Sequence, residues 1–141
     1  MIRIATTADV PRLIEMGERF RSSSTYNRYL AGNAEQMKKF AKEIIDGDGL
    51  IVSERNGHIT GMLGFVVFRH FISRETTGGE VFWWVEPEYR GDGLKLLRAA
   101  EKCARGVGAK RFQMIAPSEE VEKLYELMGY EYVESTYQKM L

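Results

Sequence analysis

The sequence predicts a single α/β domain in which helices cover a mixed β-sheet. Three observations support this fold class. The chain has 141 residues, which is the usual size of one domain. An Asn56-Gly57 pair between two apolar runs is a strong signal for a β-hairpin and therefore for antiparallel strands. Strand and helix patterns alternate near the end of the chain, which favours a mixed sheet with helices on its faces.

A strand and two helices are expected before residue 50. Residues 2–5 alternate as in a short strand, and a Thr6-x-x-Asp9 pattern followed by a proline marks the start of a helix. Residues 21–27 break the helical spacing and are expected to form a loop. Asn33 can cap a second helix, which a Gly-Asp-Gly turn ends. The apolar faces are Val10, Leu13, Ile14, Gly17 and Phe20 in the first helix and Met37, Phe40, Ala41, Ile44 and Ile45 in the second.

Three strands are expected in the middle of the chain. Leu50–Arg55 and His58–Phe71 flank the Asn-Gly turn, and Thr76–Gly79 is expected to be a further turn. Glu80–Val85 follows as a strand rich in aromatic residues. It stops at the next Glu-Pro pair, because proline has no N–H to donate to a ladder.

Helices and strands alternate in the last third of the chain. In order, we expect a helix at Leu94–Arg105, a strand at Arg111–Ala116, a helix capped by Ser118 and ended by Gly129, and strands at Tyr130–Glu134 and Thr136–Met140. The complete order is β-α-α-β-β-β-α-β-α-β-β, in one domain over residues 1–141.

Composition and charge exclude several classes of protein. Lys+Arg and Asp+Glu both number 20, so the formal net charge is +0 and no long-range field draws the chain to nucleic acid or an acidic membrane. One cysteine, Cys103, forms no internal disulfide, and with two histidines it offers too few ligands for an ordinary zinc site. No apolar run has the length of a membrane span, and residues 1–4 begin as a strand rather than a signal peptide. We therefore expect a cytoplasmic protein without nucleic-acid, membrane or metal partners.

The clearest functional signal lies in the segment Val85-Glu86-Pro87-Glu88-Tyr89-Arg90-Gly91-Asp92-Gly93. A strand runs into a glycine loop, and the loop opens a helix. Glycine lets the backbone approach a ligand closely, and the free N–H groups of the helix's first turn face the same point. With the positive end of the helix dipole behind them, these groups form a site suited to a pyrophosphate. The alternative is an ordinary turn before a helix.

The pattern Val85-x-Pro87-x-Tyr89-Arg90-Gly91-x-Gly93 resembles the acetyl-CoA-binding motif of the GNAT (Gcn5-related N-acetyltransferase) family. The segment Leu124–Tyr130 is similar to the family's helix that ends in a tyrosine followed by a glycine-aromatic pair. The match is good over the C-terminal part of the chain and rests mainly on element order before it. The resemblance implies the GNAT fold. The Trp83-Trp84 pair and Thr136–Lys139 also resemble segments of small phage or prophage members.

The resemblance implies that the chain uses acetyl-CoA as a co-substrate, with the pantetheine arm between the strands that hold Val85 and Ile115. The family usually reads Arg/Gln-x-x-Gly-x-Gly/Ala; here Lys95 stands where the last Gly or Ala belongs, which indicates a pyrophosphate loop shortened by two residues. For Trp84, Lys95 and Ser118 the alternatives are core packing, a solvated charge and a helix cap. The residues expected to contact acetyl-CoA are Trp84, Val85, Arg90, Gly91, Asp92, Gly93, Leu94, Lys95 and Ser118.

The resemblance also implies two catalytic residues. Glu80 stands where many members carry the general base that removes a proton from the amine, and its alternative is a solubilising charge at a strand edge. Tyr125 matches the general acid that protonates the leaving thiolate, and its alternative is a core tyrosine on the apolar helix face. Glu86 is a poorer candidate for the base, because beside the loop it is expected to be exposed.

We therefore expect an N-acetyltransferase in which the amine of a small molecule or peptide attacks acetyl-CoA directly. The acceptor is expected in a cleft between the first two helices, the loop Ser22–Tyr29 and the last strands. One alternative is a GNAT-fold module that has lost catalysis and binds CoA weakly or not at all. Another is a different nucleotide-binding α/β protein, which the hairpin and the lack of an acidic ribose partner disfavour. The sequence leaves open whether the chain forms a homodimer.

Overall fold

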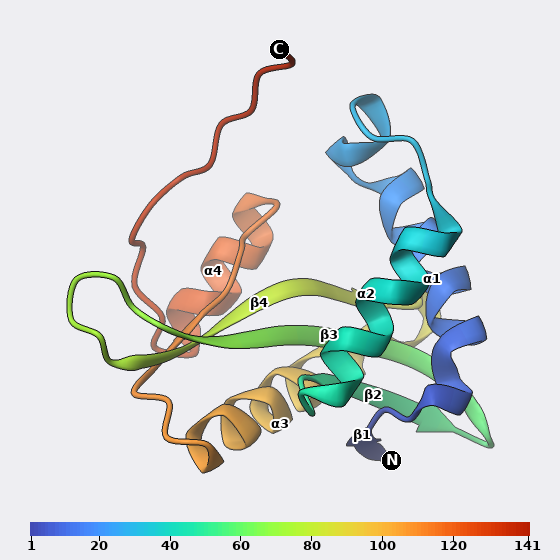
Figure 1. Cartoon of the computed structure of the whole chain (residues 1–141), viewed down its shortest axis with the longest axis horizontal. Helices are drawn as coiled ribbons and strands as arrows, with labels where there is room; N and C mark the ends of the chain where they lie inside the picture. The colour runs from blue at the N-terminus through green and yellow to red at the C-terminus, as the bar shows by residue number, and fades with distance from the viewer.

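A five-stranded mixed sheet organises the computed structural model, which describes all residues 1–141 (Figure 1). The strands follow the chain order β1-β2-β3-β4-β5; the first four pair antiparallel, and β4 and β5 pair parallel. The strands are β1 (Ile2–Ile4), β2 (Leu50–Arg55), β3 (His58–Arg69), β4 (Thr76–Val85) and β5 (Arg111–Gln113). The helices are α1 (Val10–Ser23), α2 (Ala34–Asp46), α3 (Gly93–Gly106) and α4 (Glu119–Leu127). The predicted mixed α/β fold is confirmed.

Two hydrophobic clusters hold the helices to opposite faces of the sheet. Leu50 and Val52 of β2 join Met16 and other residues of α1 and α2 in one cluster. Ile51, between them, joins Leu97 and other residues of α3 and α4 in the second. Successive side chains of a strand point to opposite faces, so one strand supplies both clusters. The sheet is therefore a middle layer between two helix pairs.

β4 and β5 part shortly after they meet. Their ladder joins Thr77–Gly79 to Arg111–Gln113 and goes no further, although β4 continues to Val85. On its other side, β4 pairs Phe82 with Gly64 and Glu80 with Phe65, which leaves Val81 as an extra residue. Such a bulge bends a strand and increases its twist. The bulge lies where β5 leaves β4, and a gap opens between the two strands beyond it.

The first helix needs two corrections of its boundaries. The Thr6–Asp9 capping box is present, but it caps a short 3₁₀ turn, η1 (Thr7–Asp9), that leads into α1. The segment expected as a loop at residues 21–27 instead continues α1 to Ser23 and then forms a second 3₁₀ turn, η2 (Thr25–Arg28). Arg21 explains the compact shape of this segment, because its guanidinium donates to Asn27 and to the carbonyl of Leu30.

The turn predicted at Thr76–Gly79 is wrong, because these residues begin β4 and the turn lies before them. Gly78 is there for close packing rather than for a turn: a Cβ at this position would lie 2.7 Å from the Phe112 ring. The strands on either side of the turn also differ from their predicted bounds. β3 ends at Arg69 rather than at Phe71, and β4 begins at Thr76 rather than at Glu80. The physical reason is that glycine marks a tight approach of two chains as readily as a turn.

The two final strands, Tyr130–Glu134 and Thr136–Met140, do not form. These residues follow α4 as an extended tail that carries no ladder (Figure 1). The strand expected at Arg111–Ala116 also ends early, at Gln113. A strand pattern needs a neighbouring edge to pair with, and local sequence does not reveal whether one is in reach. No helix is both long and apolar enough to cross a membrane.

Candidate active site

Glu80 and Tyr125 meet on one residue in the gap between β4 and β5. The backbone N–H of Ile115 donates to a carboxylate oxygen of Glu80 over 2.8 Å. The hydroxyl of Tyr125 donates to the carbonyl of Ile115, also over 2.8 Å. The two residues predicted as base and acid therefore bond to the main chain of the same residue, although 45 positions separate them in the chain.

Burial makes the Glu80 carboxyl a weaker acid than an ordinary glutamate, because it raises the pKa of this group. It raises the pKa of Glu80 to about 7, while the hydrogen bond from Ile115 acts in the opposite direction. Taking a carboxylate out of water disfavours its charged form, and one backbone N–H does not compensate for that cost. A carboxyl with this pKa exchanges protons near neutral pH, which is what a general base requires.

Tyr125 belongs both to the core and to the gap. Its side chain is 6% exposed, and its ring stacks on Trp83 with a centroid distance of 6.1 Å. Burial, followed by the nearby charges of Glu80 and Tyr130, raises the pKa of Tyr125, so its hydroxyl stays protonated. The core interpretation and the catalytic one are therefore compatible, because the ring packs inward while the hydroxyl reaches the gap.

The adjacent tryptophans lie on opposite faces of β4. Trp83 packs against the cluster of α3 and α4, and Trp84 against the cluster of α1 and α2. Trp84 also meets the edge of Phe20, and the guanidinium of Arg90 lies over it at 4.8 Å from the ring centroid. Such a cation over an indole is attracted by the ring's negative face. The indole N–H groups of both tryptophans are buried without hydrogen-bond partners.

The segment predicted to bind a pyrophosphate is more regular than a loop. Residues Pro87–Asp92 form a 3₁₀ helix, η3, that passes directly into α3. The N–H of Gly93 donates to the carbonyl of Arg90, so this amide is used within the turn. Gly91 faces open space, whereas a Cβ on Gly93 would lie 3.1 Å from the Trp83 ring. Gly91 is thus the glycine with room for a ligand, and Gly93 is the one that packs.

The carboxylate of Asp92 is buried beneath this turn instead of facing a ligand. Arg55 holds both its oxygens, at 2.8 and 2.9 Å, and the ammonium of Lys95 lies 3.3 Å away. The Arg55 guanidinium, and after it Lys95, keep the pKa of Asp92 below its usual range. The Lys95 side chain is 63% exposed, so its ammonium remains accessible at the first turn of α3.

The other residues expected to contact a cofactor take part in core packing or helix capping. Val85 is buried in the cluster beneath α3, and Leu94 is half-buried. The hydroxyl of Ser118 accepts from the N–H of Val121 and so caps α4. A cap of this kind accounts for Ser118 without a ligand.

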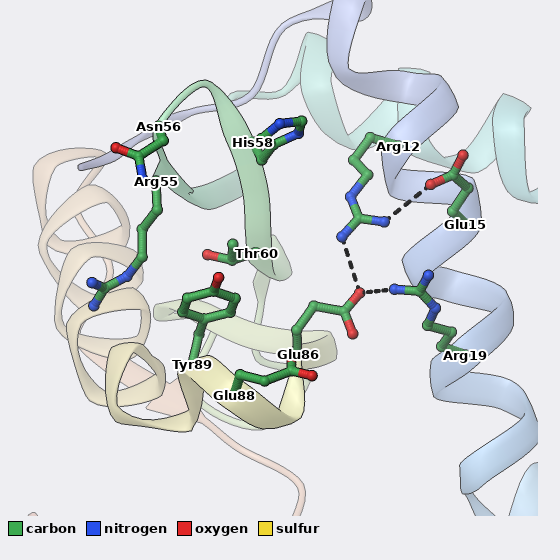
Figure 2. A pocket seen from close by; sticks show the side chains of 10 residues that line it. All are labelled: Arg12, Glu15, Arg19, Arg55, Asn56, His58, Thr60, Glu86, Glu88 and Tyr89. Carbon is green, nitrogen blue, oxygen red and sulfur yellow. Dashed lines mark hydrogen bonds and ion pairs between the residues drawn. The ribbon is translucent and has the colours of Figure 1, made fainter.

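The expectation that Glu86 is exposed is wrong, because the structure buries its side chain. It is 6% accessible, and one carboxylate oxygen accepts from both Arg12 and Arg19 of α1. Figure 2 shows this group beside a polar cavity of about 800 Å³ between α1, the β2–β3 turn and η3. Glu86 and Asp92 thus anchor the two ends of η3, each through two basic side chains. Nothing local to Glu86 indicates partners more than 60 positions away.

Comparison with solved structures supports the fold, whereas no curated protein matches the sequence. A putative acetyltransferase from Agrobacterium tumefaciens shares 16% identity at a TM-score of 0.77, with 100% of this chain and 99% of that one covered. A glucosamine-6-phosphate N-acetyltransferase from Arabidopsis thaliana shares 19% identity at a TM-score of 0.76, with coverage of 99% and 97%. AAC(6')-Iy, solved with the bisubstrate analog CoA-S-monomethyl-acetylneamine, shares 14% identity at a TM-score of 0.77, with coverage of 100% and 98%.

Sequence comparison identifies the family directly. The model described as "Acetyltransferase (GNAT) family" matches residues 14–130. This range contains the gap between β4 and β5, the turn before α3, and the paired Glu80 and Tyr125. The chain belongs to the acetyltransferase (GNAT) family.

Proposed function

We propose that this chain transfers the acetyl group of acetyl-CoA to the amine of a small molecule, with Glu80 as general base and Tyr125 as general acid. Membership of the acetyltransferase family supports acetyl transfer in general. The observation that carries the residue assignment is the meeting of Glu80 and Tyr125 on the two main-chain groups of Ile115. They are the two titratable side chains that bond to the peptide at the mouth of the parted strands.

The residues around this gap fit acetyl-CoA. Beside the first turn of α3 lie open space at Gly91 and the largely exposed side chain of Lys95, which together suit a diphosphate. The unpaired edge of β4 from Glu80 to Val85 can hold the amides of a pantetheine arm as a neighbouring strand would. When bound, the co-substrate supplies a thioester whose carbonyl carbon accepts the attacking nitrogen.

The two side chains then balance the protons of the transfer. As the lone pair of the neutral amine attacks the carbonyl carbon, Glu80 takes one proton from the nitrogen, so that a neutral amide results. A C–N bond forms, the C–S bond breaks, and the sulfur leaves as a thiolate. Tyr125, protonated because of its raised pKa, donates to that thiolate. The second oxygen of Glu80 has no protein partner, so it is available to the amine.

An apolar cavity supports a small-molecule acceptor. It has a volume of about 300 Å³ and lies beneath α1, α2 and η2, with Phe82 of β4 in its wall. Two structural neighbours support this class of acceptor by name, since one acts on glucosamine-6-phosphate and the other was solved with an acetylneamine analogue. Phe82 follows the bulge at Val81, so the cavity adjoins the strand that carries Glu80.

Calorimetric titration with acetyl-CoA, followed by a screen of amines for release of free CoA, tests this function. We expect a Kd of about 1 μM, equivalent to roughly −8 kcal/mol. We also expect at least one small amine to release CoA from the wild-type protein and much less from Glu80→Gln. Failure to bind acetyl-CoA at millimolar concentration would refute the proposal.

A further inference from the structure

The cavity beneath α1, α2 and η2 has an apolar and partly aromatic wall. Twelve of the 17 residues that line it are hydrophobic. The rings of Phe40 and Phe82 meet edge to face, with 6.4 Å between their centroids. Those of Phe20 and Tyr26 lie at the same distance and are tilted by 56°. Tilted rings of this kind pack well against a further apolar or aromatic group, so the wall suits a ligand with an apolar body.

The same wall offers no free charge to a polar ligand. No aspartate or glutamate lines the cavity, so a second ammonium group would find no carboxylate there. Arg21 is the only charged residue in the wall. Its guanidinium already donates to Glu18 at 3.0 Å, to Asn27 at 3.1 Å and to the carbonyl of Leu30 at 3.0 Å. A phosphate or an extra ammonium placed in this cavity would lose its water without meeting an unpaired opposite charge.

The cavity adjoins the strand that carries the proposed base. Phe82 belongs to its wall, and Glu80 lies two positions earlier on β4, with the bulge residue Val81 between them. Two positions of a strand span about 7 Å. An apolar body that packs against Phe82 can therefore present an amine to Glu80 through a short linker. Tyr26 and Leu30, which also line the cavity, are 42% and 49% exposed, so a ligand can enter from solvent.

Gly17 and Met37 limit the size of the cavity from neighbouring helices. Both residues line it, Gly17 on α1 and Met37 on α2. A Cβ on Gly17 would lie 2.7 Å from the Cε atom of Met37, so the glycine leaves the space that the thioether fills. Glycine inside a helix is less stable than alanine, which indicates that Gly17 serves packing rather than helix formation. A larger residue at position 17 must displace the flexible tip of Met37 and change the space beside it.

We infer that the acceptor is a primary amine on an apolar body, an alkylamine or an arylalkylamine, whose body fills this cavity within the limit set by Gly17 and Met37. This inference rests on the acetyl transfer proposed above and names the class of acceptor. The products are the N-acetylated amine and free CoA. The apolar wall favours such a body, and the lack of a free charge disfavours sugar phosphates and amines with several ammonium groups.

Rates of CoA release at saturating acetyl-CoA, measured over a series of amines, test this preference. We expect kcat/KM to rise by about fourfold for each methylene added between ethylamine and hexylamine, the gain from moving one CH₂ group out of water. 2-Phenylethylamine should exceed glucosamine 6-phosphate by at least about 100-fold, since the sugar phosphate would bury polar groups without partners. An equal or higher kcat/KM for the sugar phosphate overturns the inference but leaves acetyl transfer standing.

Gly17→Ala tests the cavity itself. Its methyl group displaces Met37, so kcat/KM for 2-phenylethylamine should fall by about tenfold, while that for ethylamine stays within about twofold. Gly106→Ala is the matched control: it also adds a methyl group to a helical glycine, but this one meets no atom within 4 Å, so neither rate should change. Met37→Ala enlarges the cavity and should shift the best alkylamine to a longer chain. Equal losses on both amines in Gly17→Ala, or no loss on either, overturn the assignment.

Calorimetry of 2-phenylethylamine with the full chain, in the presence and absence of CoA, separates this inference from the proposed function. Binding to the wild type that Gly17→Ala weakens supports the cavity even where no amine releases CoA, a result that would refute the transfer alone. Absence of binding to the wild type overturns the inference, whichever amine the protein acetylates.

Discussion

At the scale of single residues, Glu80 and Tyr125 each make a structural hydrogen bond beside the chemical role that we propose for them. The Glu80 carboxylate satisfies a backbone N–H that β5 no longer pairs, and the Tyr125 hydroxyl satisfies the carbonyl of that same residue. Removing either group therefore changes both a hydrogen bond and the proposed reacting centre. Substitutions that keep the shape of the side chain separate these two effects.

Glu80→Gln keeps an oxygen for the Ile115 amide but loses the base. We expect kcat/KM to fall by about 100-fold, the usual contribution of a general base. Because the base acts when deprotonated, wild-type activity should rise with pH through about 7, the pKa of Glu80, and the variant should lose that rise. Initial rates across this pH range measure both effects. Glu88→Gln, which changes an exposed carboxyl within η3, is the control, and equal profiles for Glu80→Gln and wild type would contradict the assignment.

Tyr125→Phe keeps the ring stacked on Trp83 but removes the donor to Ile115. We expect kcat to fall by about tenfold or more, with the affinity for acetyl-CoA unchanged. The lost hydrogen bond should cost about 1 kcal/mol of stability. Steady-state kinetics with calorimetry separates the two effects. Tyr130→Phe, which loses a bond to Glu101 only, is the matched control, and an unchanged kcat in Tyr125→Phe returns Tyr125 to a purely structural role.

At the scale of elements, η3 and the first turn of α3 form one continuous segment that ion pairs hold at both ends of η3. Glu86 fixes the start of η3 to α1 through two arginines, and Asp92 fixes its end to Arg55 and Lys95. Both carboxylates are buried, whereas their basic partners are partly in water. The turn that is expected to hold the diphosphate therefore depends on ion pairs for its position.

Gly91→Glu tests the diphosphate site without disturbing packing. A Cβ at Gly91 meets no atom within 4 Å, unlike one at Gly93, so the variant should fold normally. Its carboxylate would stand where the diphosphate is expected, and we expect Kd for acetyl-CoA to rise by at least about tenfold through charge repulsion. Calorimetry measures the change, with Gly91→Gln as the neutral control of the same size. Equal affinities of the two variants would show that the phosphates bind elsewhere.

Glu86→Ala should destabilise the fold. It leaves Arg12 and Arg19 close together without their shared carboxylate, and removing one partner of a buried pair costs about 3–5 kcal/mol. Since both arginines are partly exposed, we expect a smaller loss of roughly 1–3 kcal/mol. Urea unfolding measures it. Glu15→Ala, which removes an exposed partner of Arg12, should change stability by less than about 0.5 kcal/mol, and a similar result for Glu86→Ala would contradict the anchoring role.

At the scale of the whole molecule, the sheet separates two helix layers and its central gap imposes a pH dependence on folding. Burial raises the pKa of Glu80 from 4.5 to about 7, so the folded chain binds a proton more tightly than the unfolded chain does. The stability that this proton contributes is complete below pH 4.5 and is lost as pH rises to about 7. Asp9 and Asp92 have lowered pKa values, caused first by Arg3 and Arg55, so their contributions fail only in acid below 3.8.

We therefore expect the free energy of unfolding to fall by roughly 2–3 kcal/mol between about pH 5 and about pH 8 in the wild type. Glu80→Gln should lack this fall and be the more stable protein at the higher pH. Urea unfolding at the two pH values checks the difference. Parallel pH profiles for the two proteins would show that Glu80 is not the group responsible.

Much of the fold could be read from local sequence. The apolar periodicity of α1 and α2, the Asn-Gly turn between β2 and β3, and the Ser118 cap each depend on neighbours within a few residues. Glu80, Tyr125 and the turn before α3 were predicted as well, each from a resemblance that its own short segment of the chain carries. These features have short-range causes, so the sequence by itself determined them.

Only the tertiary structure decided which side chains meet. It buried Glu86 between two arginines of α1, turned Asp92 beneath Arg55, and brought Glu80 and Tyr125 to a single peptide segment. It also left the tail without a strand, despite a strand-forming composition. Each outcome depends on groups far apart in the chain, whose burial and pairing follow from packing rather than from residue order. Local sequence preference predicts a helix or a strand. Long-range contacts determine whether a strand pairs and which charged groups surround a side chain.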